Sequence, residues 1–167
     1  FNFRVSPELG QCWLVPRNVK AGERDGKATY SKVATFQIGY RGWQELAMRS
    51  GDVESFDRGV VRMRDTFEFE QGTTPFLKFR PHQVQAERGA ITYVWASATM
   101  RSGRVVFDVQ PVEEIERHRR MSDTQNEWVQ GKKVQAAGPV GIWAQHYEAM
   151  AARIPMSYLC KLKLPKS

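Results

Sequence analysis

Residues 36–52 read Phe-Gln-Ile-Gly-Tyr-Arg-Gly-Trp-Gln-Glu-Leu-Ala-Met-Arg-Ser-Gly-Asp, and the spacing of their apolar side chains changes once, near the middle. Phe36 and Ile38 alternate with a polar neighbour, as in a half-buried strand, whereas from Trp43 onward the apolar residues follow helical spacing. Gly51 stands where a helix commonly ends in the left-handed conformation. The stretch therefore predicts a strand, a tight connection and a short helix.

Tyr40 and Arg41 lie at that connection, between Gly39 and Gly42. Glycines let a backbone or a ligand approach closely, and arginine carries a permanent cation whose planar fork suits phosphate. The pair is a candidate binding site. A solvated polar tip with no ligand would explain the same pattern.

The elements on both sides favour antiparallel pairing. Their order contains no β-α-β alternation, so the chain is expected to be α+β, with antiparallel β-hairpins and sheet, packed helices and a long C-terminal helix. The polar residues 122–141 are expected to form a mobile loop. The predicted elements are a strand at 10–17 stopped by Pro16, a polar loop at 18–29, strands at 30–40 and at 53–64 with a break at Gly59, hairpins at 67–80 and 90–109, and helices at 111–121 and from about Ile142, the last kinked by Pro155.

The hairpin at 90–109 carries a second cluster of cations. Ser102 and Gly103 are typical of a two-residue turn. Arg101 and Arg104 would then lie opposite each other, so two cations would project from the tip with no acid beside them. A solvated hairpin tip remains the alternative.

Length and charge limit the choice of function. The 167 residues suffice for one domain, 1–167, and because the sequence begins with Phe1 we expect a fragment that lacks N- and C-terminal segments. The net charge is +7, from 25 Lys and Arg against 18 Asp and Glu, which favours a polyanionic partner. A basic protein with no such partner would have the same composition.

Several classes of function find no support in the sequence. Cys12 and Cys160 are too far apart in the sequence for a zinc motif or a disulfide framework, and no apolar run approaches the roughly 18 residues of a membrane span, so a cytoplasmic location is expected. Residues 22–28 are one residue too short for a phosphate-binding P-loop. Asp25 and Lys27 have the acid-x-Lys spacing of some nucleases, but no further acids can be assigned to a metal pair. The motif search therefore assigns no catalytic residue and no metal ligand.

Three blocks of sequence, at 9–16, 37–51 and 141–151 with Leu164-Pro165, resemble the RecT family of phage recombination proteins in order and spacing. Residues 60–110, with the Phe-Glu-Phe hairpin and the Arg-Ser-Gly-Arg turn, are also similar to that family. The resemblance covers nearly the whole chain.

The resemblance implies an ATP-independent single-strand annealing protein that coats single-stranded DNA, pairs it with a complementary strand and acts as a homo-oligomeric ring or filament. It implies no enzyme activity and no required cofactor, although Mg²⁺ could serve as a counterion. Its partners would be single-stranded DNA, the annealed duplex and a phage exonuclease, without a membrane, and its location would be the cytoplasm of a bacterial host cell. A single-stranded DNA-binding protein that does not anneal, or a metal-dependent DNA nuclease, are the alternatives.

An annealing protein must hold the phosphates and leave the base edges free for the second strand. Basic residues in a groove, with aromatic side chains that support the bases, would meet this need. Arg41, Arg153 and Lys161 match basic positions of the family, and four others match by region. The predicted DNA-binding residues are Lys20, Tyr40, Arg41, Arg101, Arg104, Lys132, Arg153 and Lys161.

Overall fold

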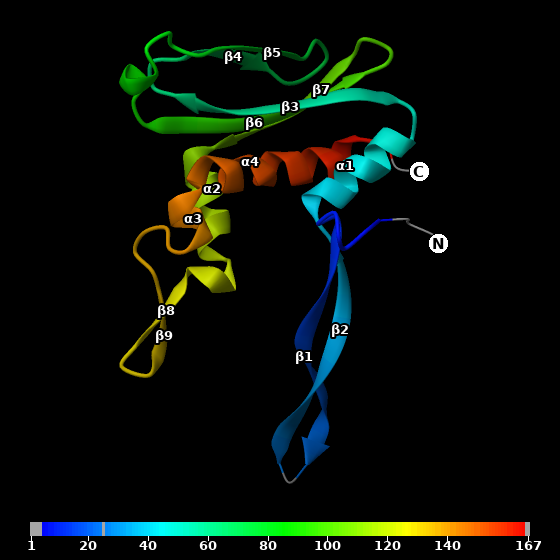
Figure 1. Ribbon diagram of the computed structural model, residues 1–167, viewed down its shortest axis with the longest axis vertical. Helices are drawn as coiled ribbons and strands as arrows, with labels where there is room; N and C mark the ends of the chain where they lie inside the picture. The colour runs from blue at the N-terminus through cyan, green and yellow to red at the C-terminus, as the bar shows by residue number, and fades with distance from the viewer. Residues whose placement is uncertain (1–4, 25, 166–167) are drawn as a thin grey trace. The chain divides into compact units, whose positions relative to one another are not determined.

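The structure, a computed structural model, describes residues 5–24 and 26–165. The chain divides into two compact units, Phe1–Leu46 and Ala47–Ser167. Strands and helices are mixed and every strand pair is antiparallel, which confirms the predicted α+β class (Figure 1). The elements are β1 (Cys12–Arg24), β2 (Lys27–Ile38), α1 (Tyr40–Arg49), β3 (Val53–Arg62), β4 (Thr66–Glu70), β5 (Phe76–Arg80), the 3₁₀ turn η1 (Gln85–Glu87), β6 (Ile91–Met100), β7 (Val105–Pro111), α2 (Val112–Arg120), the 3₁₀ turn η2 (Asp123–Gln125), β8 (Asn126–Val129), β9 (Lys132–Gln135), α3 (Ile142–Gln145), α4 (Tyr147–Tyr158) and the π-helical turn η3 (Leu159–Lys163).

The first unit contains a long two-stranded ribbon of β1 and β2. Its pairing runs from Cys12 opposite Ile38 to Arg24 opposite Lys27. The prediction that β1 stops at Pro16 and that 18–29 form a loop was wrong, because the strand continues through the proline. Both strands of a two-stranded ribbon are edges, and an edge strand tolerates a residue that has no N–H to donate.

The change of pattern within residues 36–52 is confirmed. Strand β2 ends at Ile38 and helix α1 begins at Tyr40, with only Gly39 between them. Gly51 follows the helix with a φ of 80°, the left-handed conformation expected at a helix end. The strand, the connection and the helix were therefore all readable from residue spacing.

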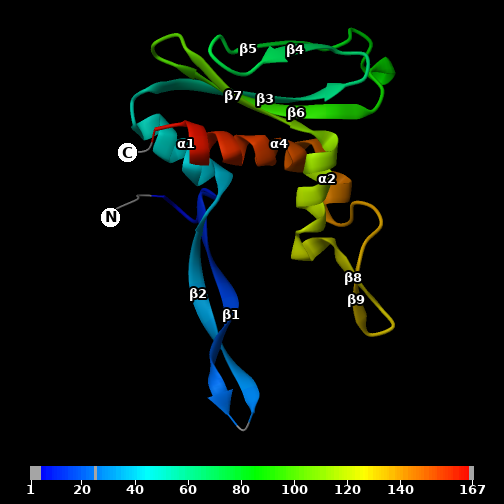
Figure 2. The ribbon, with the colours of Figure 1, turned by 180° about the vertical axis from the view of Figure 1, so that it is seen from behind.

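The second unit is built on a three-stranded sheet with the order β3-β6-β7. Side chains alternate across β6, so its two faces have different neighbours. Tyr93 and Trp95 contact the β4–β5 ribbon through Phe67 and Phe79, with ring centroids 5.8 and 5.6 Å apart. Val94 points the other way, into the buried core. Both ribbon views show the β4–β5 ribbon along one face of the sheet and α4 along the other (Figures 1 and 2).

Small and branched side chains fill the space between the sheet and the helices. Two alanines of α4, Ala151 and Ala152, allow the helix backbone to approach the sheet closely. The buried cluster consists of Val60, Val94, Ile115, Trp143, Ala151 and Ala152. No described helix has the length and apolar character that a membrane crossing requires.

Strand β3 runs without a break through Gly59, contrary to the prediction. Gly59 is paired with Trp95 in the neighbouring strand. A Cβ atom at this position would lie 2.9 Å from the indole Nε1 of Trp95, so the missing side chain makes room for the ring. The glycine is a packing requirement here.

The turn between β6 and β7 has three residues, Arg101 to Gly103, where two were predicted. The N–H of Gly103 donates to the carbonyl of Met100 at 2.8 Å, and the N–H of Met100 donates to the carbonyl of Arg104 at 2.8 Å. Gly103 has a φ of 79°, which is typical of a three-residue hairpin loop. Arg104 therefore faces Met100, and Arg101 lies within the turn.

Residues 122–141, expected as a loop, contain the 3₁₀ turn η2 and the short β8–β9 ribbon. Whether this segment is mobile stays a prediction. The single C-terminal helix expected from Ile142 is divided, because His146 has the non-helical angles φ −137° and ψ 49°. Pro155 lies inside α4, which continues to Tyr158 and then passes into the π-helical turn η3.

Candidate nucleic-acid interface

The predicted binding residues are distributed over both units. In the first unit these are Lys20 in β1 and, in the first turn of α1, Tyr40 and Arg41. In the second unit these are Arg101 and Arg104 at the β6–β7 turn, Lys132 at the start of β9, Arg153 in α4 and Lys161 in η3.

The Gly-Tyr-Arg-Gly block packs against the start of β1. A Cβ atom at Gly42 would lie 2.3 Å from the carbonyl oxygen of Gln11, and one at Gly39 would lie 2.2 Å from the ring of Trp13. Both glycines are therefore needed so that the start of α1 can pack against the backbone of Gln11 and the ring of Trp13. The sequence predicted a close approach at these glycines, and the approaching group is the protein itself.

Arg41 is exposed and Tyr40 is half-buried beside it. The Nε of Arg41 donates a hydrogen bond to the Tyr40 hydroxyl at 3.3 Å, and its Cζ lies 6.0 Å from the centroid of the Tyr40 ring. This hydrogen bond raises the pKa of the Arg41 guanidinium, which is charged at every physiological pH. The two side chains thus present an aromatic ring and a cation side by side.

Arg101 and Arg104 are brought together by the β6–β7 turn, and both are exposed. The N–H of Arg101 donates to the carbonyl of Asp52 at 2.9 Å, which fixes the turn to the start of β3. Among the described residues, neither arginine side chain forms an ion pair. Their charges are available to a ligand.

Arg104 also lines two neighbouring hollows between the β6–β7 turn and the loop that joins β4 to β5. The larger has a volume of about 580 Å³ and an apolar wall that includes Pro75, Phe76 and Val105. The smaller, of about 160 Å³, is lined by Arg104 and Lys163. The turn, this loop and η3 therefore converge at one end of the sheet.

Lys161 and Arg153 lie on the C-terminal helical segment. Lys161 is exposed, and Lys163 in the same turn forms an ion pair with Asp108 at 2.9 Å and donates to the carbonyl of Phe107 at 2.8 Å. These contacts attach η3 to β7. Arg153 is half-buried, and its Nη1 lies 3.2 Å from the sulfur of Met150.

Lys20 and Lys132 lie on two different ribbons. Lys20 forms an ion pair with Glu23 at 3.7 Å in which both side chains are more than half exposed, so the pair holds the lysine only weakly. Lys132 begins the second strand of the β8–β9 ribbon, which follows α2 at the far end of β7 from the arginine turn (Figure 1). Lys132 is therefore not part of the Arg101–Arg104 cluster.

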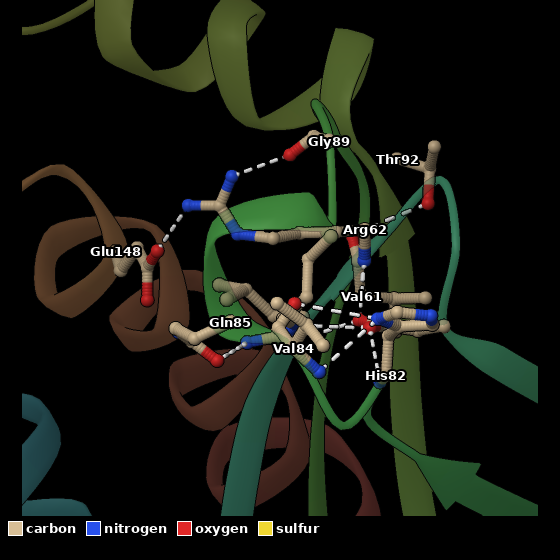
Figure 3. A network of polar contacts seen from close by, with 11 residues as sticks. Val61, Arg62, His82, Val84, Gln85, Gly89, Thr92 and Glu148 are labelled. Atoms are coloured by element: carbon tan, nitrogen blue, oxygen red, sulfur yellow. Dashed lines mark hydrogen bonds and ion pairs between the residues drawn. The ribbon is translucent and has the colours of Figure 1, made fainter.

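Several other arginines are engaged in structural ion pairs. Arg88 and Asp65 form a buried pair with N···O distances of 2.8 and 2.6 Å. Arg62 joins β3 to α4 through Glu148 and donates to the carbonyl of Gly89 at 2.7 Å (Figure 3). These cations therefore stabilise the fold through contacts within the second unit.

Sequence reasoning missed the polar network at the root of the β8–β9 ribbon. Arg119 and Gln125 are both fully buried and bonded to each other, with 3.2 Å between Nη1 and Oε1. The charge pattern of α2 was fully explained by the helix dipole, so nothing in the sequence marked Arg119 as buried. Trp128, on the same ribbon, was also not singled out.

A metal-dependent nuclease would need a cluster of acidic or histidine ligands. No group of three or more His, Cys, Asp or Glu side chains suitable for a metal occurs within residues 5–24 and 26–165. Asp25, the acid of the nuclease alternative, lies outside the described residues.

Comparison with known proteins places this chain in a family. The model of the RecT family matches residues 4–167. Protein RecT of Escherichia coli strain K12 is 34% identical over 153 residues, which cover 92% of this chain and 49% of that protein. The chain thus spans about half the length of this relative. With a family match over almost all of its length, the chain belongs to the RecT family.

Proposed function

We propose that this chain is the DNA-annealing core of a recombination protein, which binds single-stranded DNA and pairs it with a complementary strand without ATP. Membership of the RecT family over residues 4–167 carries this proposal. The arginines of the β6–β7 turn, which are exposed and form no ion pair with any described residue, support it, because a polyanion is the ligand that such a surface attracts.

The binding mode follows from what annealing requires. The second strand reads the sequence through its own bases, so the protein holds phosphates and leaves base edges accessible. Arg41, Arg101, Arg104 and Lys161 are exposed cations suited to this role, with Tyr40, Lys20, Lys132 and Arg153 as further contacts. If about four phosphates are neutralised per subunit, log affinity falls with log salt with a slope of roughly −2.8 for a single strand.

A single subunit with so few contacts binds weakly, and the proposal therefore includes assembly on the strand. Neighbouring subunits make each later contact effectively intramolecular, which raises the overall affinity without new contacts. A homo-oligomeric ring or filament is the form in which this multivalency is realised. A phage exonuclease that supplies the single strand is the proposed functional partner.

The experiment is a strand-pairing assay with two labelled complementary oligonucleotides and no nucleotide. The proposal expects faster pairing than in the absence of protein. Binding without acceleration would replace it with the simpler single-stranded DNA binder. Metal-dependent shortening of the labelled strand that is abolished by Asp25→Ala would replace it with the nuclease.

A further inference from the structure

The β8–β9 ribbon, residues 126–135, displays an unusually exposed tryptophan. Trp128 is 75% exposed, compared with 5% for Trp95 and for Trp143. Tryptophan is strongly buried on average in folded proteins, and its large rigid ring is enriched where another molecule binds. The exposure of Trp128 therefore needs an explanation that the packing of this chain does not supply.

The ribbon holds Trp128 on a well-defined turn. Gln130 and Gly131 have φ angles of 49° and 78°, so both central residues are left-handed. This is the pattern of a type I′ hairpin turn, whose twist matches that of the flanking strands. The register places Trp128 opposite Lys133 and Val129 opposite Lys132. The position of the indole relative to the two lysines is thus set by the backbone.

The root of the ribbon is fixed by the buried network on α2. The Nη1 of Arg119 donates to the carbonyl of Gly138 at 3.0 Å as well as to Gln125, and its Nη2 forms an ion pair with Glu116 at 2.9 Å. The Nε2 of Gln125 donates to the carbonyl of Val140 at 3.0 Å. Such a network, with all its groups satisfied, gives the ribbon a fixed attachment to α2.

The face of the ribbon that carries Trp128 favours an anionic ligand. Cross-strand partners share a face, so Trp128 shares its face with Lys133. The only acid of the ribbon, Glu127, is adjacent to Trp128 in the same strand and therefore points to the other face. An aromatic ring that shares its face with a basic side chain is the combination on which single-stranded nucleic acids stack.

We propose that Trp128 stacks on a nucleobase of single-stranded DNA, while Lys133 on the same face contacts a neighbouring phosphate. This inference rests on the proposed function and adds a base-contacting residue to it. Stacking engages the flat face of a base and leaves its pairing edge free, so the contact is compatible with annealing. Both ribbon views show β8–β9 extending away from the sheet, beyond α2, where a strand can reach it (Figure 2).

The test compares Trp128→Ala and Trp128→Phe with the unmodified protein on two ligands: an oligothymidylate and a chain of equal length without bases. Trp128→Ala is expected to weaken oligothymidylate binding by about 5- to 150-fold per engaged subunit, the range observed when a stacking aromatic is truncated. Binding to the chain without bases is expected to stay unchanged. Trp128→Phe should retain most of the affinity.

Val134→Ala is the matched control, because Val134 lies opposite Glu127 and thus on the other face of the same ribbon. Equal losses on both ligands, or a smaller assembly size in Trp128→Ala by light scattering, would overturn the inference in favour of a contact between subunits. Unchanged oligothymidylate binding would also overturn it. If the unmodified protein neither binds nor anneals DNA, the proposed function itself fails, so the two failures are distinguishable.

Discussion

Arg88 donates hydrogen bonds from Nε and Nη2 to the two carboxylate oxygens of Asp65, at 2.8 and 2.6 Å, in a pair that is almost fully buried. The backbone N–H groups of Arg62 and His82 also donate to Asp65, at 2.7 and 2.9 Å, and the Nη2 of Arg88 reaches the carbonyl of Val60. The pair therefore ties the turn after β3 to the segment that precedes β6. It is a structural clamp and not a ligand site.

Replacing Arg88 by alanine is expected to destabilise the protein by about 3 kcal/mol, because the Asp65 carboxylate would remain buried without its main partner. Chemical denaturation monitored by fluorescence measures this loss. Arg64→Ala serves as the control, since the Arg64–Glu87 pair is exposed and worth little. Equal effects of the two substitutions would contradict the stabilising role of the buried Arg88–Asp65 pair.

The same pair predicts how stability depends on pH. The hydrogen bond from Arg88 holds the pKa of Asp65 well below its usual range. A carboxyl with a lowered folded-state pKa contributes stability above its unfolded pKa, near 3.9, and that stability is lost as the pH falls further. The free energy of unfolding should therefore decrease below about pH 4, and less steeply in Asp65→Asn. A variant with the same steepness would show that other carboxyls dominate.

Gly42→Ala is expected to destabilise the first unit by about 2 kcal/mol or more, because the new methyl group would meet backbone that cannot move away freely. Its Cβ would lie 2.3 Å from the carbonyl oxygen of Gln11 and 2.7 Å from Cγ2 of Ile38. Gly138→Ala is the matched control, with nothing within 4 Å and no left-handed φ. Thermal unfolding should separate the two variants, and similar midpoints would argue against close packing at Gly42.

Features set by residues close together in the sequence were mostly predicted correctly, whereas features set by contacts between distant residues were missed. The hairpins at 67–80 and 90–109 were predictable because alternation and turn residues are local signals, and β4–β5 and β6–β7 form there. The burial of Arg119 depends on the carbonyl of Gly138, 19 residues away, and no local pattern marks such a contact. The exposure of Trp128 has the same origin, since only the folded ribbon shows that the described residues leave most of the ring uncovered.

The arginine turn gives a test of phosphate binding that is independent of Trp128. Arg101→Ala and Arg104→Ala should each weaken single-stranded DNA binding and make its salt slope shallower by about 0.7, the value for one lost phosphate contact. Arg117→Ala removes the same charge from a residue already paired with Glu114. Titrations at several salt concentrations should show an unchanged slope for that control. If all three variants gave the same slope, the two arginines would make no direct phosphate contact and would contribute only to the overall electrostatic field of the protein.

The buried network predicts a link between the core and the β8–β9 ribbon. Arg119→Met removes the bonds to Gln125 and Gly138 and the ion pair with Glu116, which keeps the hydrogen bond from the hydroxyl of Tyr147, 2.7 Å away. We expect faster hydrogen exchange at residues 126–135, because their attachment to α2 is weakened while the β6–β7 pairing is untouched. Arg120→Met, an exposed neighbour on the same helix, should exchange like the unmodified protein. If stacking on Trp128 needs a fixed ribbon, Arg119→Met should also lose affinity for oligothymidylate but not for the chain without bases. Preserved affinity for both ligands would show that the ribbon contacts DNA even when its attachment to α2 is weakened.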